Sequence, residues 1–595
     1  MPALPPAAAF FVPEVPDLPL GGEGRQFELE AGYLPARPEG RDNAQLYFVL
    51  QRAAHRPRRR KLVVRLNGGP GCSSFDGLMM EIGAWRFDAQ GKLAWSEPGG
   101  SWNDYADVLY LDQPAGTGFS YVENDAYVTS MEQMAQDVFY FLDRFVDVFP
   151  EYRGSLHGAH GTSGGVDMYL AGESYAGQYI PYIADALLNA GDRAPVRLKG
   201  VAIGNGYIDP VAQYGSEVDM MVQSGVWSAH GPEVEAVAPV VRKCRETLAK
   251  DTKPHLLYPE CDAIMDNIVA SSRRKLGGQE HCLNMYDIRL SDVYPACGMS
   301  WPPTLQATYD YLRREDVRKA LHVDAKHRPE AWRECDKRVS AALDAHGRNS
   351  SASITLLPGI LDRGVPVLLF AGESDLICNH IGLRRLVDSL TWRGRRGLDR
   401  SARPREWTLN DEHTGTWIQS RNLTYVTISN ASHMPAFDRP VAVNDMLMRF
   451  LDVEPLVPLG APPKVSSHLD GDTRVLVAGP AEKLPAQAPP KGAAAAFDNT
   501  GSLFVVVLIA LAVGLCLFMR NRHRTHRGSL YSALAPRGPN EAPEPLHLGR
   551  GPPALDEQEE PLELGQFSIG EEAEDTELAE DERAVEADAA PQNKV

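Results

Sequence analysis

Cysteine and positive charge are both scarce in this chain of 595 residues. Only eight cysteines occur, seven of them before residue 380 and the last, Cys516, inside an apolar run, which excludes a disulfide-dense scaffold. The formal net charge of −19 argues against a general nucleic-acid-binding protein. With 43% hydrophobic and 23% charged residues, a wholly disordered chain is also excluded. The length leaves room for one large catalytic domain with appendages.

Long uncharged apolar runs are equally scarce, and the clearest one covers the 17 residues 503–519. A membrane-spanning helix needs about 17–25 residues, and the arginines that follow this run place the C-terminus in the cytosol. The sequence therefore predicts a single-pass membrane protein with residues 1–500 in the lumen. So short a span suits the thinner membranes of the early secretory route.

The segments outside the main domain have biased compositions. Residues 453–502 contain eight prolines and predict a Pro- and Ala-rich stalk, and residues 520–595 predict an acidic, disordered cytosolic tail. In that tail, Tyr531-Ser-Ala-Leu534 resembles a tyrosine-based sorting signal, which would bind sorting adaptors. Residues 1–24 predict a leader or propeptide-like segment. They lack the basic start of a signal peptide, so either this start is processed or a leader precedes it.

Residues 25–452 have the pattern of an α/β enzyme. Six short apolar, β-branched runs end abruptly in Gly-rich or polar loops, and helix-like segments such as 131–149 and 180–190 lie between them. This alternation predicts a mostly parallel central sheet, in which ligands bind at the C-terminal ends of the strands. The six runs are 61–66, 107–111, 167–171, 201–203, 365–370 and 423–428.

The strongest chemical signal is Ser174 in Gly172-Glu-Ser-Tyr-Ala-Gly177. A predicted strand, a tight turn with a central serine and then a predicted helix are typical of a nucleophile elbow. The small residues around the serine allow the strained turn to approach neighbouring backbone. An ordinary serine in a Gly turn is the alternative, but the strand and helix on either side favour the nucleophile.

A serine nucleophile needs a base and an acid that orients the base. In this fold class the chain order is Ser, acid, His, so we predict Asp375 after the 365–370 strand and His433 after the 423–428 strand. Two backbone N–H groups must stabilise the oxyanion. The sequence indicates Tyr175, directly after the nucleophile, and Gly69 in the Gly-rich loop after the 61–66 strand.

Five longer motifs resemble those of the serine carboxypeptidase family: LNGGPGCSS (66–74), DQPAGTGFSY (112–121), LAGESYAGQYIPYIA (170–184), GNGYIDP (204–210) and ASHMPAFD (431–438). The similarity covers roughly residues 25–452. FDG (75–77), GSWN (100–103) and the stalk, span and acidic tail are most similar to the fungal, membrane-anchored pheromone-processing type. The resemblance implies an α/β-hydrolase fold with an insertion over the active site, removal of single C-terminal residues without a cofactor or metal, and a Golgi or trans-Golgi location.

The resemblance also implies how a peptide is held. Asn67 and Glu173 match positions that bind the substrate's C-terminal carboxylate, a role that requires Glu173 to be protonated because two carboxylates repel. The family usually has Trp where this chain has Arg65. If Arg65 faces the site, it would ionise Glu173 or bind the carboxylate itself; if it faces solvent, nothing changes.

By the same resemblance, four residues line the pocket of the leaving residue: Asp76, Met80, Glu81 and Met434. Asp76 and Glu81 would give a leaving Lys or Arg acidic partners. Glu81 is alternatively a buried structural acid, so Asp76 is the more informative residue.

The cysteines and sequons fit a lumenal enzyme. The family pattern implies a Cys72–Cys335 disulfide and a free, buried Cys378. Four further cysteines allow three pairings, of which we favour Cys244–Cys297 and Cys261–Cys282. N-x-[ST] sequons at Asn349, Asn422 and Asn430 predict glycosylation.

These observations favour a carboxypeptidase that removes C-terminal Lys or Arg from peptides and proproteins after endoproteolytic cleavage. One alternative is a carboxypeptidase of broad or apolar specificity. Another is an esterase or acyltransferase on the same fold, although Asn67 and Glu173 argue against an enzyme with no carboxylate to hold. A non-catalytic binding protein is the third, and the presence of Ser174, Asp375 and His433 weighs against it.

Overall fold

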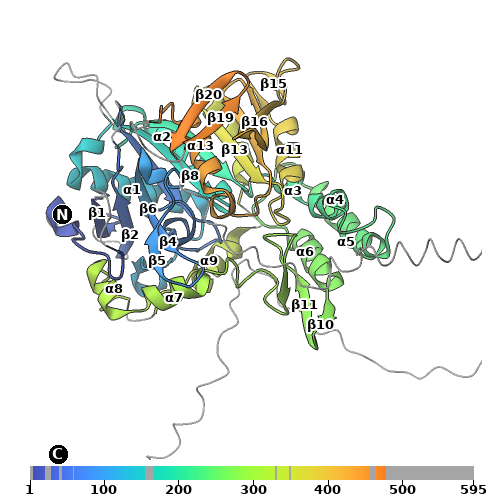
Figure 1. Cartoon of the computed structure of the whole chain (residues 1–595), viewed down its shortest axis with the longest axis horizontal. Helices are drawn as coiled ribbons and strands as arrows, with labels where there is room; N and C mark the ends of the chain where they lie inside the picture. Colours follow the sequence, from blue (N-terminus) through green and yellow to red (C-terminus); the bar gives the residue numbers. More distant parts are fainter. Residues whose placement is uncertain are drawn as a thin grey trace, which may run out of the picture. The chain divides into compact units, whose positions relative to one another are not determined.

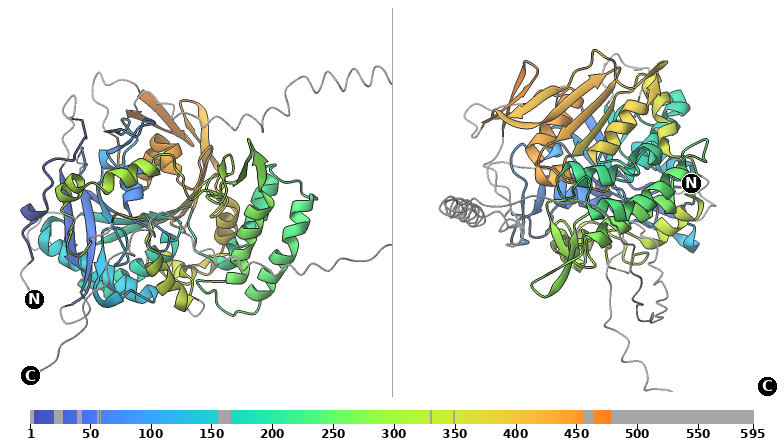
Figure 2. Two further views of the ribbon diagram at one scale, coloured as in Figure 1. Left: turned by 90° about the horizontal axis from the view of Figure 1, so that it is seen from below. Right: turned by 90° about the vertical axis from the view of Figure 1, so that its right-hand side faces the viewer.

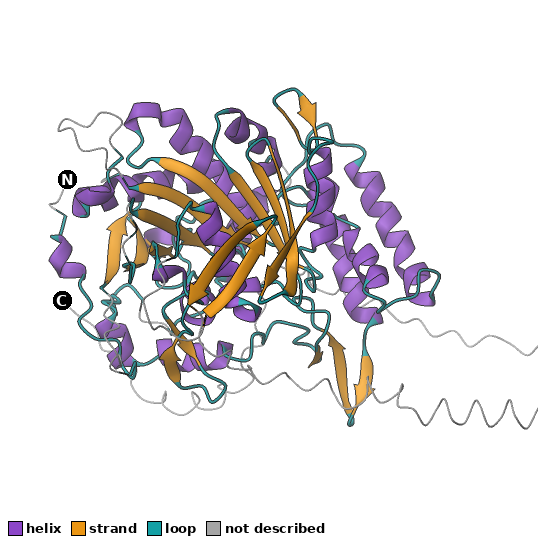
Figure 3. Ribbon diagram, turned by 45° about the horizontal axis from the view of Figure 1, so that its top comes forward, coloured by secondary structure: helices purple, strands orange, loops and turns teal. Residues whose placement is uncertain are grey.

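The computed structural model describes residues 4–19, 28–38, 43–55, 57, 59–154, 166–328, 331–347, 350–455 and 464–477. Within these ranges 13 strands form one twisted sheet with helices packed against it (Figures 1 and 3). The strand order is β1-β2-β6-β3-β8-β9-β13-β18-β17-β16-β19-β20, and β7 pairs with β2.

Six neighbouring strands in the middle of this sheet are parallel; five contain a predicted run, and β13 begins two residues after the start of the predicted run 365–370. They are almost completely buried, which explains their continuous apolar sequences. In spatial order they are β6 (Asp107–Leu111), β3 (Lys61–Leu66), β8 (Asp167–Glu173), β9 (Leu198–Gly204), β13 (Val367–Gly372) and β18 (Leu423–Ile428).

The flanking strands are antiparallel, so the sheet is mixed, and the prediction of a mostly parallel sheet holds only for its centre. These strands are β1 (Leu29–Pro35), β2 (Ala44–Gln51) and β7 (Tyr121–Val122) at one edge, and β17 (Glu412–Ser420), β16 (Arg405–Leu409), β19 (Lys464–Leu469) and β20 (Asp472–Val477) at the other. Two separate hairpins pair β4 (Trp85–Phe87) with β5 (Leu93–Trp95) and β14 (Thr391–Trp392) with β15 (Arg395–Arg396).

A hydrophobic core lies on each face of the sheet, because successive side chains of a strand point to opposite sides. In β3, Leu62 and Val64 enter one core and Val63 enters the other. The first core includes α1 (Met131–Val148), α2 (Ala176–Ala190), α9 (Lys337–Gly347), α10 (Leu357–Asp362) and α11 (His380–Ser389). The second includes α7 (Leu305–Leu312), α8 (Glu315–Ala320), α12 (Pro435–Asp438) and α13 (Pro440–Phe450).

An insertion between β9 and β13 lies beside the sheet and has a small core of its own (Figures 1 and 2). Its residues 285–288 form hydrogen bonds to the loops that follow β13 and β18, so the insertion covers the C-terminal ends of those strands. It consists of α3 (Pro210–Gln213), α4 (Ser216–Gln223), α5 (Pro232–Leu248), α6 (Pro259–Ser271), β10 (Arg274–Leu276), β11 (Gln279–Leu283) and β12 (Ser291–Val293).

Three disulfides cross-link the described residues. The predicted Cys72–Cys335 bond is confirmed, and Cys378 is free and buried as predicted. The two predicted bonds within the insertion are wrong, because the structure pairs Cys244 with Cys261 and Cys282 with Cys297. Helices α5 and α6, which carry Cys244 and Cys261, pack directly against each other. Strand β11, which carries Cys282, pairs with β12 shortly before Cys297. Each cysteine therefore pairs with the next cysteine in the sequence.

Residues 4–19, the described part of the predicted leader or propeptide-like segment 1–24, pack against the fold. Phe10 is only 5% exposed, and its ring packs against Phe48 and Phe149 with centroids 5.4 and 6.0 Å away. The backbone N–H of Val12 donates to the Leu29 carbonyl in β1. This segment is therefore tied to the edge of the sheet.

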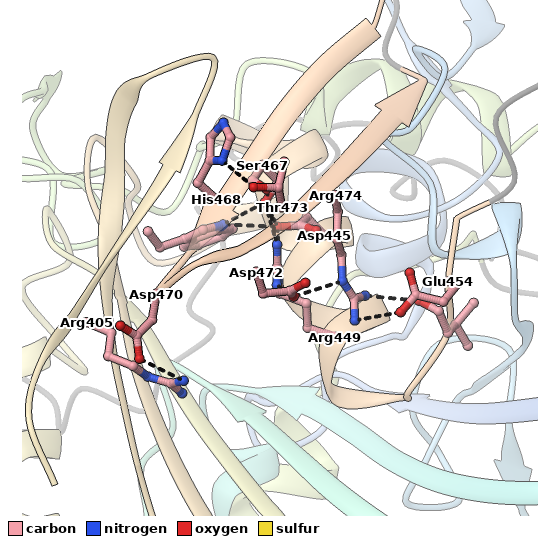
Figure 4. A network of polar contacts seen from close by, with 12 residues as sticks. Arg405, Asp445, Arg449, Glu454, Ser467, His468, Asp470, Asp472, Thr473 and Arg474 are labelled. Atoms are coloured by element: carbon pink, nitrogen blue, oxygen red, sulfur yellow. Dashed lines mark hydrogen bonds and ion pairs between the residues drawn. The ribbon is translucent and has the colours of Figure 1, made fainter.

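The C-terminal boundary also needs correction, because part of the predicted stalk extends the sheet. Strands β19 and β20 form a hairpin that pairs with β16. Figure 4 shows how α13 anchors it: Asp445 Oδ2 accepts hydrogen bonds from Ser467 Oγ at 2.5 Å and Arg449 Nε at 3.1 Å. The same oxygen accepts from Trp407 Nε1 at 3.0 Å. The stalk prediction is thus wrong for residues 464–477.

Among the described residues, no helix is both long and apolar enough to cross a membrane. Several predictions lie outside these residues: the span 503–519, the tail 520–595 with Tyr531–Leu534, most of the stalk and the sequon at Asn349.

Candidate functional site

Ser174 occupies a sharp turn between β8 and α2, with a left-handed backbone φ of 56°. Its N–H donates to the Gly204 carbonyl at 3.1 Å, and its carbonyl accepts from Gly177 and Tyr207 at 2.9 Å. A Cβ on Gly172 would lie 2.5 Å from the Leu66 carbonyl oxygen, which explains the glycine there. The turn has the backbone of a nucleophile elbow, and it presents Ser174 at the C-terminal edge of the parallel strands.

Asp375 and His433, predicted as acid and base, lie in contact. Asp375 Oδ2 is 2.9 Å from His433 Nδ1, and the Asp375 side chain is fully buried. Three further donors hold the carboxylate: Asn205 Nδ2 at 2.7 Å and the backbone N–H groups of Ile377 at 3.1 Å and Cys378 at 3.2 Å. This network fixes the orientation of the imidazole ring.

The electrostatic surroundings raise the pKa of His433. Burial alone would lower the pKa of the imidazole, but the charge and hydrogen bond of Asp375 outweigh it, and Glu173 acts in the same direction. The nearby Arg65 opposes them, and the net result is a raised pKa. The influence of Glu173 also places His433 near the elbow, since Glu173 directly precedes Ser174.

The predicted oxyanion donors lie on two segments in close contact. A Cβ on Gly68 would lie 2.6 Å from the Tyr175 nitrogen and 2.8 Å from Ser174 Cβ, so only glycine allows the 67–71 loop this close to the elbow. Among the described residues, the N–H groups of Gly69 and Tyr175 have no backbone acceptor. Two free donors beside a serine can stabilise a developing oxyanion.

Arg65 faces the site and not solvent. It is 2% exposed, and its Nη2 lies 2.7 Å from Glu81 Oε1 and 3.1 Å from Glu173 Oε2. Burial would lower the pKa of the guanidinium, but Glu173 and Glu81 raise it further, so the group stays cationic. The backbone carbonyl of Leu66 accepts another of its hydrogen bonds. The sequence left both orientations of Arg65 open, and the structure selects the inward one.

Asp76 completes a cluster of buried acids on this side of Ser174. Its Oδ2 accepts from Asn67 Nδ2 at 2.5 Å. Burial first, and then the charges of Glu334, Glu173 and Glu81, raise its pKa well above the usual value despite Arg65. Burial likewise raises the pKa of Glu334 to about 7, although a hydrogen bond with Asp76 lowers it. Of these four carboxyl groups, Arg65 forms ion pairs with two, those of Glu81 and Glu173.

The other predicted residues occupy the following places. Glu81 ends the short helical turn η3 (Gly77–Glu81); burial and Glu173 raise its pKa well above the usual value, and Arg65 opposes them. Met80 is buried in the same turn, and Met434 directly precedes α12, which contacts η3. Asn430 is exposed, whereas Asn422 is partly buried and donates to the Gly364 carbonyl at 3.3 Å.

Two residues of the site escaped the sequence analysis. Asn205 contacts Asp375, and its position in the Gly204-Asn-Gly206 loop after β9 was a usable signal, because that loop lies at the same sheet edge. Glu334 reaches Asp76 because the next residue, Cys335, is bonded to Cys72. The predicted disulfide could have identified it.

Comparisons with known proteins agree with this geometry. The family model described as "Serine carboxypeptidase" matches residues 19–453. The pheromone-processing carboxypeptidase KEX1 of Coprinopsis cinerea is 39% identical over 540 residues, which cover 87% of this chain and 84% of that protein. The KEX1 protein of Tuber melanosporum is 38% identical, with 89% and 83% covered. The crystal structure of KEX1(delta)p, a prohormone-processing carboxypeptidase from Saccharomyces cerevisiae, superposes with a TM-score of 0.68 at 29% identity and covers 79% of this chain and 99% of its own.

Proposed function

Because the chain belongs to the serine carboxypeptidase family, we propose that it removes C-terminal Lys and Arg from peptides and proproteins that an endoprotease has cut. The observation that carries the basic specificity is the acid cluster of Asp76, Glu81 and Glu334 beside the elbow. A buried cluster with more carboxyl groups than cations has a strong electrostatic affinity for a cationic side chain.

In the proposed chemistry each residue of the site has one role. Ser174 Oγ attacks the carbonyl carbon of the last peptide bond while its proton passes to His433, and Asp375 stabilises the imidazolium. The N–H groups of Gly69 and Tyr175 stabilise the oxyanion. The proton then goes to the nitrogen of the leaving amino acid as the peptide bond breaks. A water molecule, deprotonated by His433, hydrolyses the acyl-enzyme and regenerates Ser174.

Recognition of the peptide end restricts this chemistry to the last residue. The substrate's carboxylate binds beside Arg65 and accepts the second N–H of Asn67 Nδ2, whose other N–H is donated to Asp76. In this chain the Arg65 guanidinium forms ion pairs with Glu173 and Glu81. The negative carboxylate of the substrate therefore has a positive charge beside it as well as acidic residues. Met80 and Met434 contact the aliphatic part of the leaving side chain.

The rest of the chain suits processing in the secretory pathway. Residues 503–519 anchor the enzyme in the Golgi or trans-Golgi membrane, with the catalytic domain in the lumen and residues 520–595 in the cytosol. Tyr531–Leu534 binds sorting adaptors, and Asn349, Asn422 and Asn430 are glycosylation sites. The disulfides fit this oxidising compartment.

The test uses the full-length chain and peptides that differ only in the last residue: Arg, Lys, Leu or Glu. We expect release of Arg and Lys to be fastest, and a folded Ser174→Ala variant to lose about 10⁴-fold or more of kcat. Equal rates for Arg and Leu would establish broad specificity instead. Faster turnover of a blocked peptide ester than of the free acid would indicate an esterase, and absence of fluorophosphonate labelling at Ser174 would indicate a non-catalytic protein.

A further inference from the structure

A large cavity of about 1520 Å³ lies at the end of the parallel strands opposite to Ser174. It is lined by Lys61, Asp167 and Leu198, which begin β3, β8 and β9, whereas Ser174 directly follows the last residue of β8. The seven residues of β8 separate the two ends by about 20 Å. We refer to this space as the basal cavity, and none of the residues assigned above to peptide binding or cleavage lines it.

The basal cavity is rich in positive charge, although the chain as a whole has a formal net charge of −19. Its cationic residues are Arg59, Arg60, Lys61, Arg197, Lys199 and Arg363. Two of them are compensated by acids that do not line the cavity. Arg60 pairs with Asp107 at 2.9 Å, and Arg363 pairs with Asp185 at 2.9 Å. Four cations remain.

These four cations have one buried acid among them. Asp167 Oδ2 lies 3.2 Å from Lys61 Nζ and 3.6 Å from Arg59 Nη1. Arg197 and Lys199 have no ion-pair partner among the described residues. Burial first, and then the charges of the three other cations, lower the pKa of Lys199, although Asp167 opposes them. The repulsion among these cations therefore exceeds what Asp167 offsets.

Three further acids line the basal cavity without removing this surplus. They are Asp192, Asp452 and Glu454, and all three are exposed to solvent. Exposed charges interact weakly across water. Glu454 is moreover paired with Arg474 at 3.3 Å. The strongest field in the cavity is therefore positive and surrounds Lys199.

Tyr169 adds a hydrogen-bond donor to this positive region. It lines the cavity and is only 7% exposed, yet its hydroxyl has no hydrogen-bond partner among the described residues. Burial and the charges of Asp167 and Asp452 raise its pKa. Arg59 and Arg197 oppose this shift without reversing it, so the hydroxyl keeps its proton. An anionic oxygen bound in the cavity would accept the hydrogen bond that the protein leaves unmade.

The charge balance indicates the class of ligand. Guanidinium, ammonium and hydroxyl donors are the groups with which proteins bind phosphate. Four positive charges face the one negative charge of Asp167, whereas a phosphate monoester carries only about −1.5 to −2 at pH 7. Two phosphate groups offset the surplus more completely than one. Tyr105, Leu187 and Phe450 supply an apolar wall for the organic part of such a ligand.

We propose that the basal cavity binds a ligand with two phosphate groups, which contact Arg197, Lys199 and the Tyr169 hydroxyl. This site lies at the opposite end of β8 from Ser174, so the inference does not depend on the proposed peptide specificity. A free organic diphosphate and a phosphorylated lipid headgroup share the required chemistry, and the experiment distinguishes these two sources.

The probe is pyrophosphate, and calorimetry measures its binding to the full-length chain at constant ionic strength. We expect saturable binding at one site, with Kd at least about tenfold higher in Lys199→Gln and in Tyr169→Phe. Tyr169→Phe keeps the buried ring and removes only the hydroxyl. Arg384→Gln is the control, because Arg384 pairs with Asp388 outside the cavity, and its Kd should equal that of the wild type.

Each outcome bears on the inference. No saturable binding to the wild type, or an equal Kd in the wild type and Lys199→Gln, overturns it. If Lys199→Gln does not fold, Arg197→Gln decides by the same comparison. Displacement of pyrophosphate by an equal concentration of sulfate overturns the assignment to two phosphates.

Two competitors then identify the source of the phosphates, and displacement by either supports the site. Tighter competition by a nucleoside diphosphate indicates a free organic diphosphate. Tighter competition by a soluble, short-chain phosphatidylinositol phosphate, which also has two phosphate groups, indicates a lipid headgroup. If neither displaces pyrophosphate, the cavity does not accept an organic ligand and the inference is overturned.

Discussion

The carboxylate of Glu173, directly before the nucleophile, lies 3.1 Å from Nη2 of Arg65. The same nitrogen is 2.7 Å from Glu81. The serine carboxypeptidase pattern usually has Trp, an uncharged residue, where this chain has Arg65. A guanidinium therefore lies where a neutral side chain is usual, at the place where we propose that the substrate's C-terminal carboxylate binds. This exchange changes the charge of the site, and with it the expected pH dependence of peptide binding.

Arg65→Trp should make binding of free-acid peptides more sensitive to pH. Without the guanidinium, no cation offsets Glu81 and Glu173, so they repel the substrate carboxylate, and protonation of Glu81 at low pH relieves part of this repulsion. We expect KM of the variant to rise more steeply than that of the wild type between pH 5 and 7.5. The measurement is KM against pH for both proteins with one peptide.

A peptide amide of the same sequence is the control, since it has no terminal carboxylate. Its KM should depend on pH similarly in both proteins. Parallel KM–pH profiles for the free-acid peptide would show that Arg65 has no part in carboxylate binding.

Asn205→Ala should lower kcat and shift the pH profile. The Asp375 carboxylate loses a donor that offsets its charge, so its effect on the imidazole grows, which should raise the pKa of His433 further and move the acidic limb of kcat/KM to higher pH. We expect a loss of about 10- to 100-fold in kcat. Asn444→Ala is the matched control, because that buried amide donates to the Gly99 carbonyl away from the site. A lower kcat with an unmoved limb would mean that Asn205 is only structural.

The sequence predicted the central strands and the places of Ser174, Asp375 and His433 because local signals coincide there. A strand buried on both faces is a continuous apolar run, and a strained turn requires small residues. Since parallel strands end at one edge, the loops that follow β8, β13 and β18 had to lie together.

The features that the sequence did not predict depend on contacts between distant segments. Glu334 reaches Asp76 only through the Cys72–Cys335 bond, and no local pattern marks it. The cysteine pairing in the insertion follows from the packing of α5 against α6, which spacing does not specify. The β19–β20 hairpin has a clear Asp470-Gly471 turn, but the prolines around it favoured a stalk.

The fold should be more stable at mildly acidic pH. Burial raises the pKa values of Glu217, Asp262 and Glu334 to about 7, far above their values in an unfolded chain. A raised carboxyl pKa stabilises the folded state fully below the unfolded pKa near 4, and this contribution is lost as the pH rises through about 7. We therefore expect Tm to be at least about 2 °C higher at pH 5.5 than at pH 7.5. Glu217→Gln should reduce this difference, and a Tm that is equal or higher at pH 7.5 would contradict the prediction.

Asp76→Asn should reduce the release of C-terminal Arg far more than that of Leu. A cation bound at the Asp76 cluster needs its counter-charge, and truncating one partner of a buried pair costs about 2–5 kcal/mol, roughly 30- to 4,000-fold in kcat/KM. Leu does not use that charge. The measurement is kcat/KM for two peptides that differ only in a final Arg or Leu.

Glu81→Gln and Asp336→Asn are the comparisons for Asp76→Asn. Glu81 is paired with Arg65, so its loss should act more on folding than on specificity, and Asp336 is paired with Arg338 outside the cluster. An unchanged Arg-to-Leu ratio in Asp76→Asn would remove Asp76 from the leaving-residue site. The carboxypeptidase activity itself would stand.

Ser467→Ala should destabilise the catalytic domain even though the residue lies beyond the catalytic motifs. Ser467 is fully buried, donates to Asp445 at 2.5 Å and accepts from Arg449 at 2.9 Å. Removing the Ser467 hydroxyl leaves the buried Asp445 carboxylate and the Arg449 guanidinium each without one hydrogen bond. This should lower the free energy of unfolding by about 1–3 kcal/mol. The measurement is the denaturant concentration at the midpoint of chemical unfolding for both proteins, together with their m-values, which should be equal. Ser466→Ala, at the neighbouring and partly exposed position, is the control. If Ser467→Ala unfolds at the same denaturant concentration as the wild type, the hairpin does not contribute to the fold and the stalk begins near residue 453.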